Sequence, residues 1–353
     1  MVENFSTSAS NSQHSAKATA SRKKTATPPS PHNPYEASSN SMSIETIHKK
    51  WIEDPSAVTL IDAHHHFWDL KKNYYPWLSD CPIDPIFLDN YDSLKRNYLP
   101  DDYRADARGH NVLKTVHIEA EWNRNDQIGE TQWLSDISVR YGMPNAVVAH
   151  AWFHTDDAEE IIARQAAYPL VRGIRSKPVT ATSPSADTPT GPGTMRDVKW
   201  LRGLSKLEKY NLTWDMRVPS WHLVEAADVA RSFPRINMVL NHTGFPLDRS
   251  EEGIAAWRIG MDALAGHSNV YVKVSEFGLK GQPWGYESNR RVVREAISIF
   301  GIERCIFASN WPVVGLRIDY DTLVRSVKRM IGNFSEADQD RFFWRNAQSF
   351  YRL

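Results

Sequence analysis

The sequence predicts an α/β fold, a (β/α)8 TIM barrel, and three observations carry this prediction. From about residue 44 onward, short apolar runs rich in β-branched residues alternate with longer stretches of helical periodicity, and the pair recurs eight times. Eight successive strand–helix units match a closed barrel of parallel strands surrounded by helices. An open doubly wound sheet is the alternative, but the glycine-rich phosphate turn typical of that fold is missing after the first apolar run.

The elements follow one another along the chain in a regular order. Strands are expected at residues 59–67, 113–121, 146–153, 171–177, 212–218, 237–244, 269–277 and 305–312. Helices are expected between them at 127–141, 156–167, 198–210, 222–232, 253–265, 289–300 and 321–331. A final helix is expected to begin after Ser335, a favourable N-cap, and to run to the C-terminus.

Two expected connections are longer than the ~2–6 residues of most βα loops. Residues 68–99 are rich in aromatic side chains, and residues 178–197 are dense in Ser, Thr, Pro and Gly. Because both follow strands, both would cover the carboxyl ends of the strands, where barrel enzymes keep their active sites.

Residues 1–43 are expected to form a disordered Ser- and Pro-rich tail, which leaves 44–353 as one barrel domain. Such a segment buries too little apolar area to offset its ordering entropy. It lacks the apolar core of a secretory signal, and its prolines oppose the amphipathic helix of an organelle transit peptide. A plain flexible tail is the favoured interpretation.

Composition restricts the partners and the compartment. Lys plus Arg and Asp plus Glu each number 42, so no global charge attracts nucleic acid or an anionic membrane. No apolar run approaches the ~20 residues that span a bilayer. Cys81 and Cys305 lack zinc or redox spacing, which favours a reducing compartment, and a cytoplasmic location is expected. A small-molecule partner is therefore expected, and a homo-oligomer stays open.

Two histidines at the end of the first expected strand, His64 and His66, are the strongest candidate site residues. Alternate residues of a strand share a face, so both imidazoles point to one side. An incidental run of histidines is the alternative, but an apolar strand that leads into His-x-His is unusual for a purely structural element. His242 ends the sixth expected strand, so closure of the barrel would bring it to the same mouth.

Charged and aromatic residues at other strand ends are candidates for substrate binding. Arg175 and Arg217 end the fourth and fifth expected strands, and converging arginines suit bidentate capture of a carboxylate. Each arginine would otherwise pair with an acid between barrel and helices. Glu121 ends the second strand, and Trp68 follows the first strand in the aromatic loop, so both are assigned to substrate binding.

Five motifs together resemble the amidohydrolase superfamily: Ile61-Asp-Ala-His-His-His-Phe-Trp-Asp, Tyr75-Pro-Trp-Leu, Val171-Arg-Gly-Ile-Arg, Asn241-His-Thr-Gly and Ser309-Asn-Trp-Pro. Within it, residues 58–353 are similar to the amidohydrolase family 2 branch, which contains sugar-lactone and pyrone-dicarboxylate lactonases. The resemblance implies a (β/α)8 barrel. It also implies hydrolysis of a cyclic ester, a C–N bond or a related carbonyl compound, or decarboxylation of an aromatic acid.

The same resemblance assigns roles to individual residues. His64, His66 and His242 correspond to catalytic histidines that can hold one divalent metal such as zinc. The branch generally ends its eighth strand with an acid, but this chain has Asn310. A neutral amide cannot act as a base and is a weaker metal ligand, so Asn310 is expected to position water or substrate by hydrogen bonding.

Three functions are compatible with these residues. The favoured one is a hydrolase that opens a small oxygenated lactone or related cyclic ester, anionic or polyhydroxylated. The second is a decarboxylase of an aromatic acid, which the absent strand-eight acid and the aromatic loop favour. The third is a non-catalytic barrel that binds a metabolite, which the three retained histidines oppose.

Overall fold

The computed structural model describes residues 54–83, 88 and 90–353. The tail expected at residues 1–43 lies outside the described residues. Within the described part of the chain, no helix is long and apolar enough to cross a membrane.

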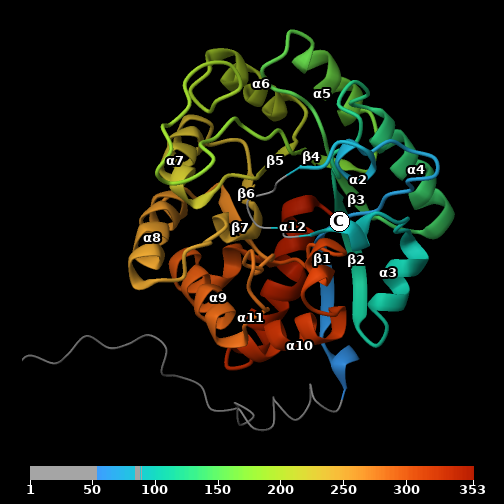
Figure 1. Cartoon of the computed structure of the whole chain (residues 1–353), viewed down its shortest axis with the longest axis vertical. Helices are drawn as coiled ribbons and strands as arrows, with labels where there is room; N and C mark the ends of the chain where they lie inside the picture. The colour runs from blue at the N-terminus through green and yellow to red at the C-terminus, as the bar shows by residue number, and fades with distance from the viewer. Residues whose placement is uncertain (1–53, 84–87, 89) are drawn as a thin grey trace, which may run out of the picture. The chain divides into compact units, whose positions relative to one another are not determined.

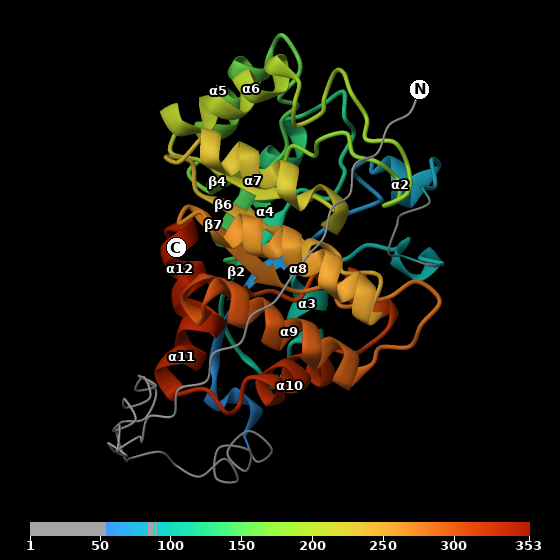
Figure 2. The same cartoon turned by 90° about the vertical axis from the view of Figure 1, so that its left-hand side faces the viewer.

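Eight parallel strands form one sheet in the order of the sequence, and helices surround it (Figures 1 and 2). The strands are β1 (Thr59–His65), β2 (Asn111–Ile118), β3 (Ala146–Ala149), β4 (Val171–Ile174), β5 (Thr213–Met216), β6 (Met238–Leu240), β7 (Val270–Val274) and β8 (Cys305–Phe307). Each strand pairs in parallel with the next one. The predicted (β/α)8 barrel and all eight expected strands are confirmed.

Hydrogen bonds between the ends of β1 and β8 close the barrel. His65 forms an isolated parallel bridge with Trp311. The Asn310 N–H donates to the His64 carbonyl at 2.7 Å, and the His66 N–H donates to the Trp311 carbonyl at 2.8 Å. The buried Asp62 carboxylate reinforces this seam, because it accepts hydrogen bonds from the Ser309 backbone at 2.9 Å and from the Ser309 hydroxyl at 2.6 Å. The seam therefore fixes Asn310 beside His64 and His66 at the carboxyl end of β1.

The helices agree with their expected positions to within three residues. They are α4 (Gly129–Tyr141), α5 (Ala158–Ala166), α6 (Val198–Lys209), α7 (Leu223–Ser232), α8 (Glu251–Ala265), α9 (Tyr286–Phe300) and α10 (Tyr320–Met330). Two short helices inside the β1–β2 connection, α2 (Pro76–Ser79) and α3 (Pro100–Asp106), were not expected. Each begins with proline at its first position and is too short to show an apolar period.

The last helix is divided into three parts. The Ser335 hydroxyl caps α11 (Glu336–Asp340), as expected, and a π-helical turn at Arg341–Arg345 leads into α12 (Asn346–Tyr351). Phe350 and Tyr351 of α12 pack against the apolar side chains inside the barrel, including Ile61 and Val239. The C-terminal helix thus plugs the barrel interior.

The expected strands extend too far at their carboxyl ends. Five non-glycine residues assigned to those ends have left-handed backbone conformations: Glu121 (φ 61°), His242 (φ 58°), Thr243 (φ 51°), Glu276 (φ 48°) and Asn310 (φ 60°). A left-handed conformation leaves the strand, so each chain segment turns directly at the mouth of the barrel. Tertiary contacts must hold these residues, because non-glycine side chains rarely adopt this conformation on their own.

The plug is linked to a buried ion pair. The Tyr351 hydroxyl lies 3.0 Å from both carboxylate oxygens of Asp215, and the Lys273 ammonium binds the same carboxylate. All three side chains are fully buried. Burial lowers the pKa of Lys273 to about 8, although Asp215 favours its charged form. The hydroxyl is therefore an important donor to a carboxylate that water cannot reach.

We expect Tyr351→Phe to lower the free energy of unfolding by about 1.5–3 kcal/mol, the usual contribution of a hydrogen bond to a buried charged group. Urea titration followed by circular dichroism measures this change. Tyr271→Phe, which removes a hydroxyl from a partly buried tyrosine packed against the same plug, is the matched control and should change it by less than about 0.5 kcal/mol. Equal values for the two variants would contradict the role of Tyr351.

Candidate active site

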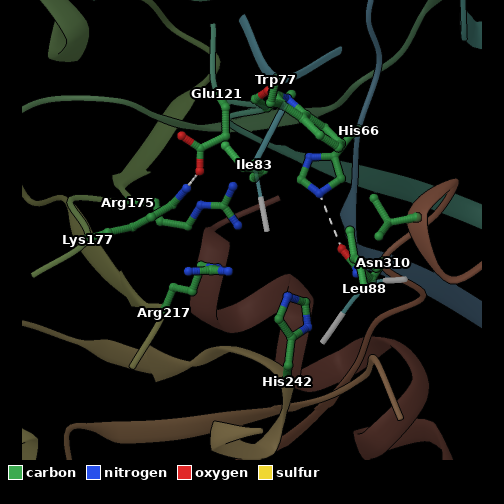
Figure 3. A pocket seen from close by; sticks show the side chains of 12 residues that line it. His66, Trp77, Ile83, Leu88, Glu121, Arg175, Lys177, Arg217, His242 and Asn310 are labelled. Atoms are coloured by element: carbon green, nitrogen blue, oxygen red, sulfur yellow. Dashed lines mark hydrogen bonds and ion pairs between the residues drawn. The ribbon is translucent and has the colours of Figure 1, made fainter. Parts of the chain in front are cut away.

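A cavity lies at the carboxyl ends of the strands (Figure 3). Its wall combines side chains that follow six strands with side chains of the β1–β2 connection. The lining residues are His66, Trp77, Ile83, Leu88, Ala120, Glu121, Arg175, Lys177, Arg217, His242, Asn310 and Val313. The polar residues among them point toward one common space (Figure 3).

Six of the expected site residues lie in this wall: His66, Glu121, Arg175, Arg217, His242 and Asn310. His64 lies next to them but is fully buried. The centre of its ring is 4.5 Å from that of His242 and 5.1 Å from that of His66. The structure thus brings the three histidines together, as the barrel topology predicted.

Trp68 occupies a different place from the one expected. Its side chain is fully buried and is not part of the cavity wall. The indole stacks behind His66, with 6.4 Å between ring centres, and its Nε1–H donates to the Arg96 carbonyl at 2.6 Å. Trp77 of α2 lines the cavity instead, and its Nε1–H donates to the Ala120 carbonyl at 2.9 Å. Trp68 is therefore placed to support His66 and not to contact a ligand directly.

The three histidines are electrically neutral at neutral pH. Burial lowers the pKa of each well below its usual range, and nearby cations lower it further: Lys273 acts on His64, and Arg175 acts on His66 and His242. The two ring nitrogens of His64 have no hydrogen-bond partner among the described residues. A neutral imidazole keeps one nitrogen lone pair, so these rings are able to accept a proton or a hydrogen bond.

Two of the rings have defined partners. His66 Nδ1 lies 2.8 Å from the Ile118 carbonyl oxygen, and its Nε2 lies 3.2 Å from Asn310 Oδ1. His242 Nδ1 lies 2.8 Å from the Ser275 hydroxyl. A carbonyl oxygen only accepts, so the His66 hydrogen resides on Nδ1. Both rings are therefore held in a fixed orientation.

A cluster of cations occupies the side of the cavity formed by β4 and β5. Arg175, Lys177 and Arg217 line the wall, and Glu121, which is paired with Lys177, is the acid among the lining residues. Burial lowers the pKa of Lys177 to about 8 and that of Arg217 to about 10. Because the cations outnumber the acid, this side of the cavity favours an anionic or oxygen-rich ligand.

Glu119 is the centre of this cluster, although it does not line the cavity. Arg175 Nε donates to its carboxylate at 2.8 Å, and Arg124 donates at 2.9 Å. Lys177 lies 3.4 Å from the same carboxylate. Burial opposes ionisation of Glu119, but Arg124, Lys177 and Arg175 together outweigh it and hold the pKa of the carboxyl well below its usual range. Glu119 therefore orients the arginine that faces the ligand.

Sequence reasoning did not assign Lys177, Glu119, Trp77 or Glu276 to the site. Lys177 has a visible signal, since it follows Arg175 by two residues and so lies on the same side of the extended chain. Glu119 and Glu121 carry the same alternation. Glu276 carries no such signal, because its contact with Asn310 joins the ends of two different strands.

Residues 61–353 match the protein family described as Amidohydrolase (Amidohydro_2). The chain belongs to the amidohydrolase 2 family. This finding confirms the resemblance to the amidohydrolase family 2 branch.

Relatives of this amidohydrolase cover nearly all of the barrel. Protein y4mH of Sinorhizobium fredii, described as uncharacterized, is 35% identical over 298 residues, which are 84% of this chain and 100% of that protein. An L-fucono-1,5-lactonase of Burkholderia ambifaria is 29% identical over 305 residues, 83% of this chain and 95% of the lactonase. A crystal structure of a Burkholderia multivorans amidohydrolase with bound zinc has a TM-score of 0.69 at 23% identity, and covers 84% of this chain and 100% of that one.

The arrangement of the histidines in this amidohydrolase does not fit the expected divalent metal. In the described part of the chain, no three His, Cys, Asp or Glu side chains are placed so that they could hold a metal ion together. Arg175, Arg217 and Lys273 are close enough to depress the histidine pKa values, and the same positive charges oppose a divalent cation. The site therefore offers the chemistry of its own side chains.

We expect Glu119→Gln in this amidohydrolase to lower the free energy of unfolding by about 3–5 kcal/mol, because it leaves buried cations without their counter-charge. Guanidinium titration measures the loss. Glu159→Gln is the matched control, since Glu159 pairs with Lys206 and Lys209 on the exposed surface and should matter little. A Glu119→Gln variant as stable as this control would contradict the central role of Glu119.

Proposed function

We propose that this amidohydrolase is a hydrolase that opens a small oxygenated lactone or related cyclic ester, anionic or polyhydroxylated. The observation that carries the proposal is the convergence of neutral histidines and three cationic side chains on one cavity. The similarity to an L-fucono-1,5-lactonase supports the choice of a lactone as substrate.

The cations bind and orient the substrate in this proposal. Arg175 and Arg217 offer planar groups of N–H donors that match a carboxylate or a pair of hydroxyls. Glu119 holds Arg175 in place before the substrate arrives, so little ordering entropy remains to be lost on binding. Lys177 adds a third positive charge at the same wall.

Ring opening then needs a base for water and donors for the developing oxyanion. A neutral histidine of the wall takes one proton as the water oxygen attacks the lactone carbonyl carbon. Arginine N–H groups stabilise the negative oxygen of the tetrahedral intermediate. The intermediate collapses as the ring C–O bond breaks, and the histidinium returns its proton to the departing alkoxide, which gives the hydroxy acid. Asn310 orients water or substrate in this scheme.

A panel of lactones tests the proposal directly. We expect the protein to open L-fucono-1,5-lactone or a carboxylated lactone such as 2-pyrone-4,6-dicarboxylate, measured as acid release with a pH indicator. Replacement by alanine of the wall histidine that acts as the base, His66 or His242, should reduce kcat by about 100-fold or more, because general-base catalysis contributes about that much.

Each alternative function has its own outcome in this experiment. Carbon dioxide released from hydroxybenzoates, without opening of any lactone, would identify a decarboxylase. Binding of these compounds that survives His64→Ala, with no turnover by the natural protein, would identify a metabolite-binding barrel. Either result would refute the hydrolase.

The low pKa of Lys177 predicts a pH dependence. Lys177 is charged below pH 8 and loses its charge as the pH rises through about 8. We therefore expect kcat/KM for the best anionic lactone of the panel to fall above about pH 8, after correction for spontaneous hydrolysis. Lys177→Arg keeps the charge at high pH and should move this fall upward. Superimposable pH profiles for the two proteins would exclude Lys177 as the titrating group.

A further inference from the structure

Glu276 is a buried carboxylate that has no role in the reaction proposed above. It follows β7, is only 4% exposed, and does not line the cavity. Its Oε2 accepts a hydrogen bond from the Asn310 side-chain amide at 2.6 Å. Asn310 itself lines the cavity, so Glu276 contacts the cavity wall through Asn310.

The Glu276 carboxylate determines the orientation of the Asn310 side-chain amide. An ionised carboxylate offers acceptors alone, so the NH2 group of Asn310 must face Glu276 and the carbonyl oxygen must face the opposite way. Burial raises the pKa of Glu276 above its usual value, and the Asn310 amide, the Arg317 guanidinium at 3.7 Å and the Gly278 N–H limit this rise by favouring the ionised form. Asn310 thereby presents its Oδ1 to His66 (Figure 3).

The Ile118 carbonyl determines the position of the hydrogen on His66 in the same way. The Ile118 carbonyl requires the hydrogen of His66 on Nδ1, which leaves the lone pair on Nε2. Two acceptors, His66 Nε2 and Asn310 Oδ1, therefore lie 3.2 Å apart at the cavity wall. Two acceptors do not satisfy each other, but a molecule with two O–H donors satisfies both. Water is such a molecule.

We propose that His66 Nε2 and Asn310 Oδ1 bind the attacking water together, and that Glu276 is the positioning residue that keeps Asn310 an acceptor. This inference rests on the proposed hydrolase function and names its base. One O–H of the water donates to Asn310 Oδ1. The other gives its proton to His66 Nε2 as the water oxygen attacks the carbonyl carbon.

The backbone supports a built arrangement. Glu276 and Asn310 both have left-handed conformations, with φ of 48° and 60°. Such conformations persist in non-glycine residues where surrounding contacts hold them, and they cluster at functional sites. The Asn310 N–H is bound to the His64 carbonyl at 2.7 Å, so the barrel seam fixes the amide at its base and Glu276 fixes it at its tip.

Three variants separate positioning from plain stability. In the Glu276→Gln variant, the glutamine amide can either donate to Asn310 or accept from it. The Asn310 amide is then free to rotate and to donate its NH2 group to His66 Nε2, which removes the water site. We expect kcat for the best lactone of the panel to fall by about 10–100-fold, with KM changed less than about threefold because the cations are untouched. Glu276→Asp keeps an acceptor and should retain part of kcat.

The decisive variant is the double replacement Glu276→Gln with Asn310→Asp. An aspartate at position 310 is an acceptor in either orientation and takes a hydrogen bond from the glutamine amide. We expect kcat to recover at least about 10-fold over Glu276→Gln. Glu225→Gln is the matched control, because Glu225 is a largely buried glutamate bound to His222 and lies outside the cavity wall. Its kcat should stay at the natural value.

Spectra of the resting protein test the same inference without turnover. Nitrogen-15 NMR of the histidines should show His66 with its hydrogen on Nδ1 and none on Nε2. The side-chain amide signals of Asn310, identified by their loss in Asn310→Asp, should shift strongly in Glu276→Gln. If no lactone is opened, the proposed function fails, and these spectra still decide the acceptor pair. A hydrogen on Nε2, unchanged amide signals, or full kcat in Glu276→Gln would overturn it.

Discussion

Closure of the barrel between β1 and β8 is the constraint on which the site depends. Asp62 holds Ser309 by two hydrogen bonds, and the backbones of His64 and Asn310 are joined next to it. This seam places residues more than 240 positions apart side by side. Burial raises the pKa of Asp62, and the Ser309 hydroxyl, the Ser309 N–H and the Tyr103 hydroxyl counteract it. A carboxylate buried at such a position is tolerated because its oxygens are satisfied.

The interior of the barrel alternates between apolar packing and compensated charge. Apolar side chains of the strands meet Phe350 and Tyr351 of the C-terminal helix, and the Asp215–Lys273 pair lies in the same interior. Above it, Glu119 gathers the cations that face the cavity. These groups hold one another in fixed positions, which is the preorganisation that the proposed binding of an oxygen-rich substrate requires. The neutral histidines result from the same burial and the same positive charges.

Local patterns in the sequence were sufficient for the fold and for the first group of site residues. Strands and helices follow from apolar periodicity, and the eightfold alternation leads to a parallel barrel. Once the barrel is assumed, residues at strand ends must meet at one mouth, which is why His66, His242, Arg175 and Arg217 were found. The prediction that Trp68 contacts a substrate was wrong, because Trp68 lies in a long loop after a strand end. In such a loop no sequence period determines the direction of a side chain.

The sequence by itself determined the barrel, its element order and the histidines and arginines at its mouth, since these depend on short-range periodicity and on a topology shared by all such barrels. Only the tertiary structure decided which atoms face each other. The contacts of Asn310 with Glu276 and with His66 join the ends of different strands, and Glu276 and Asn310 have left-handed conformations. Such contacts arise from the register of barrel closure and from donor–acceptor matching in space, and neither leaves a periodic trace along the chain.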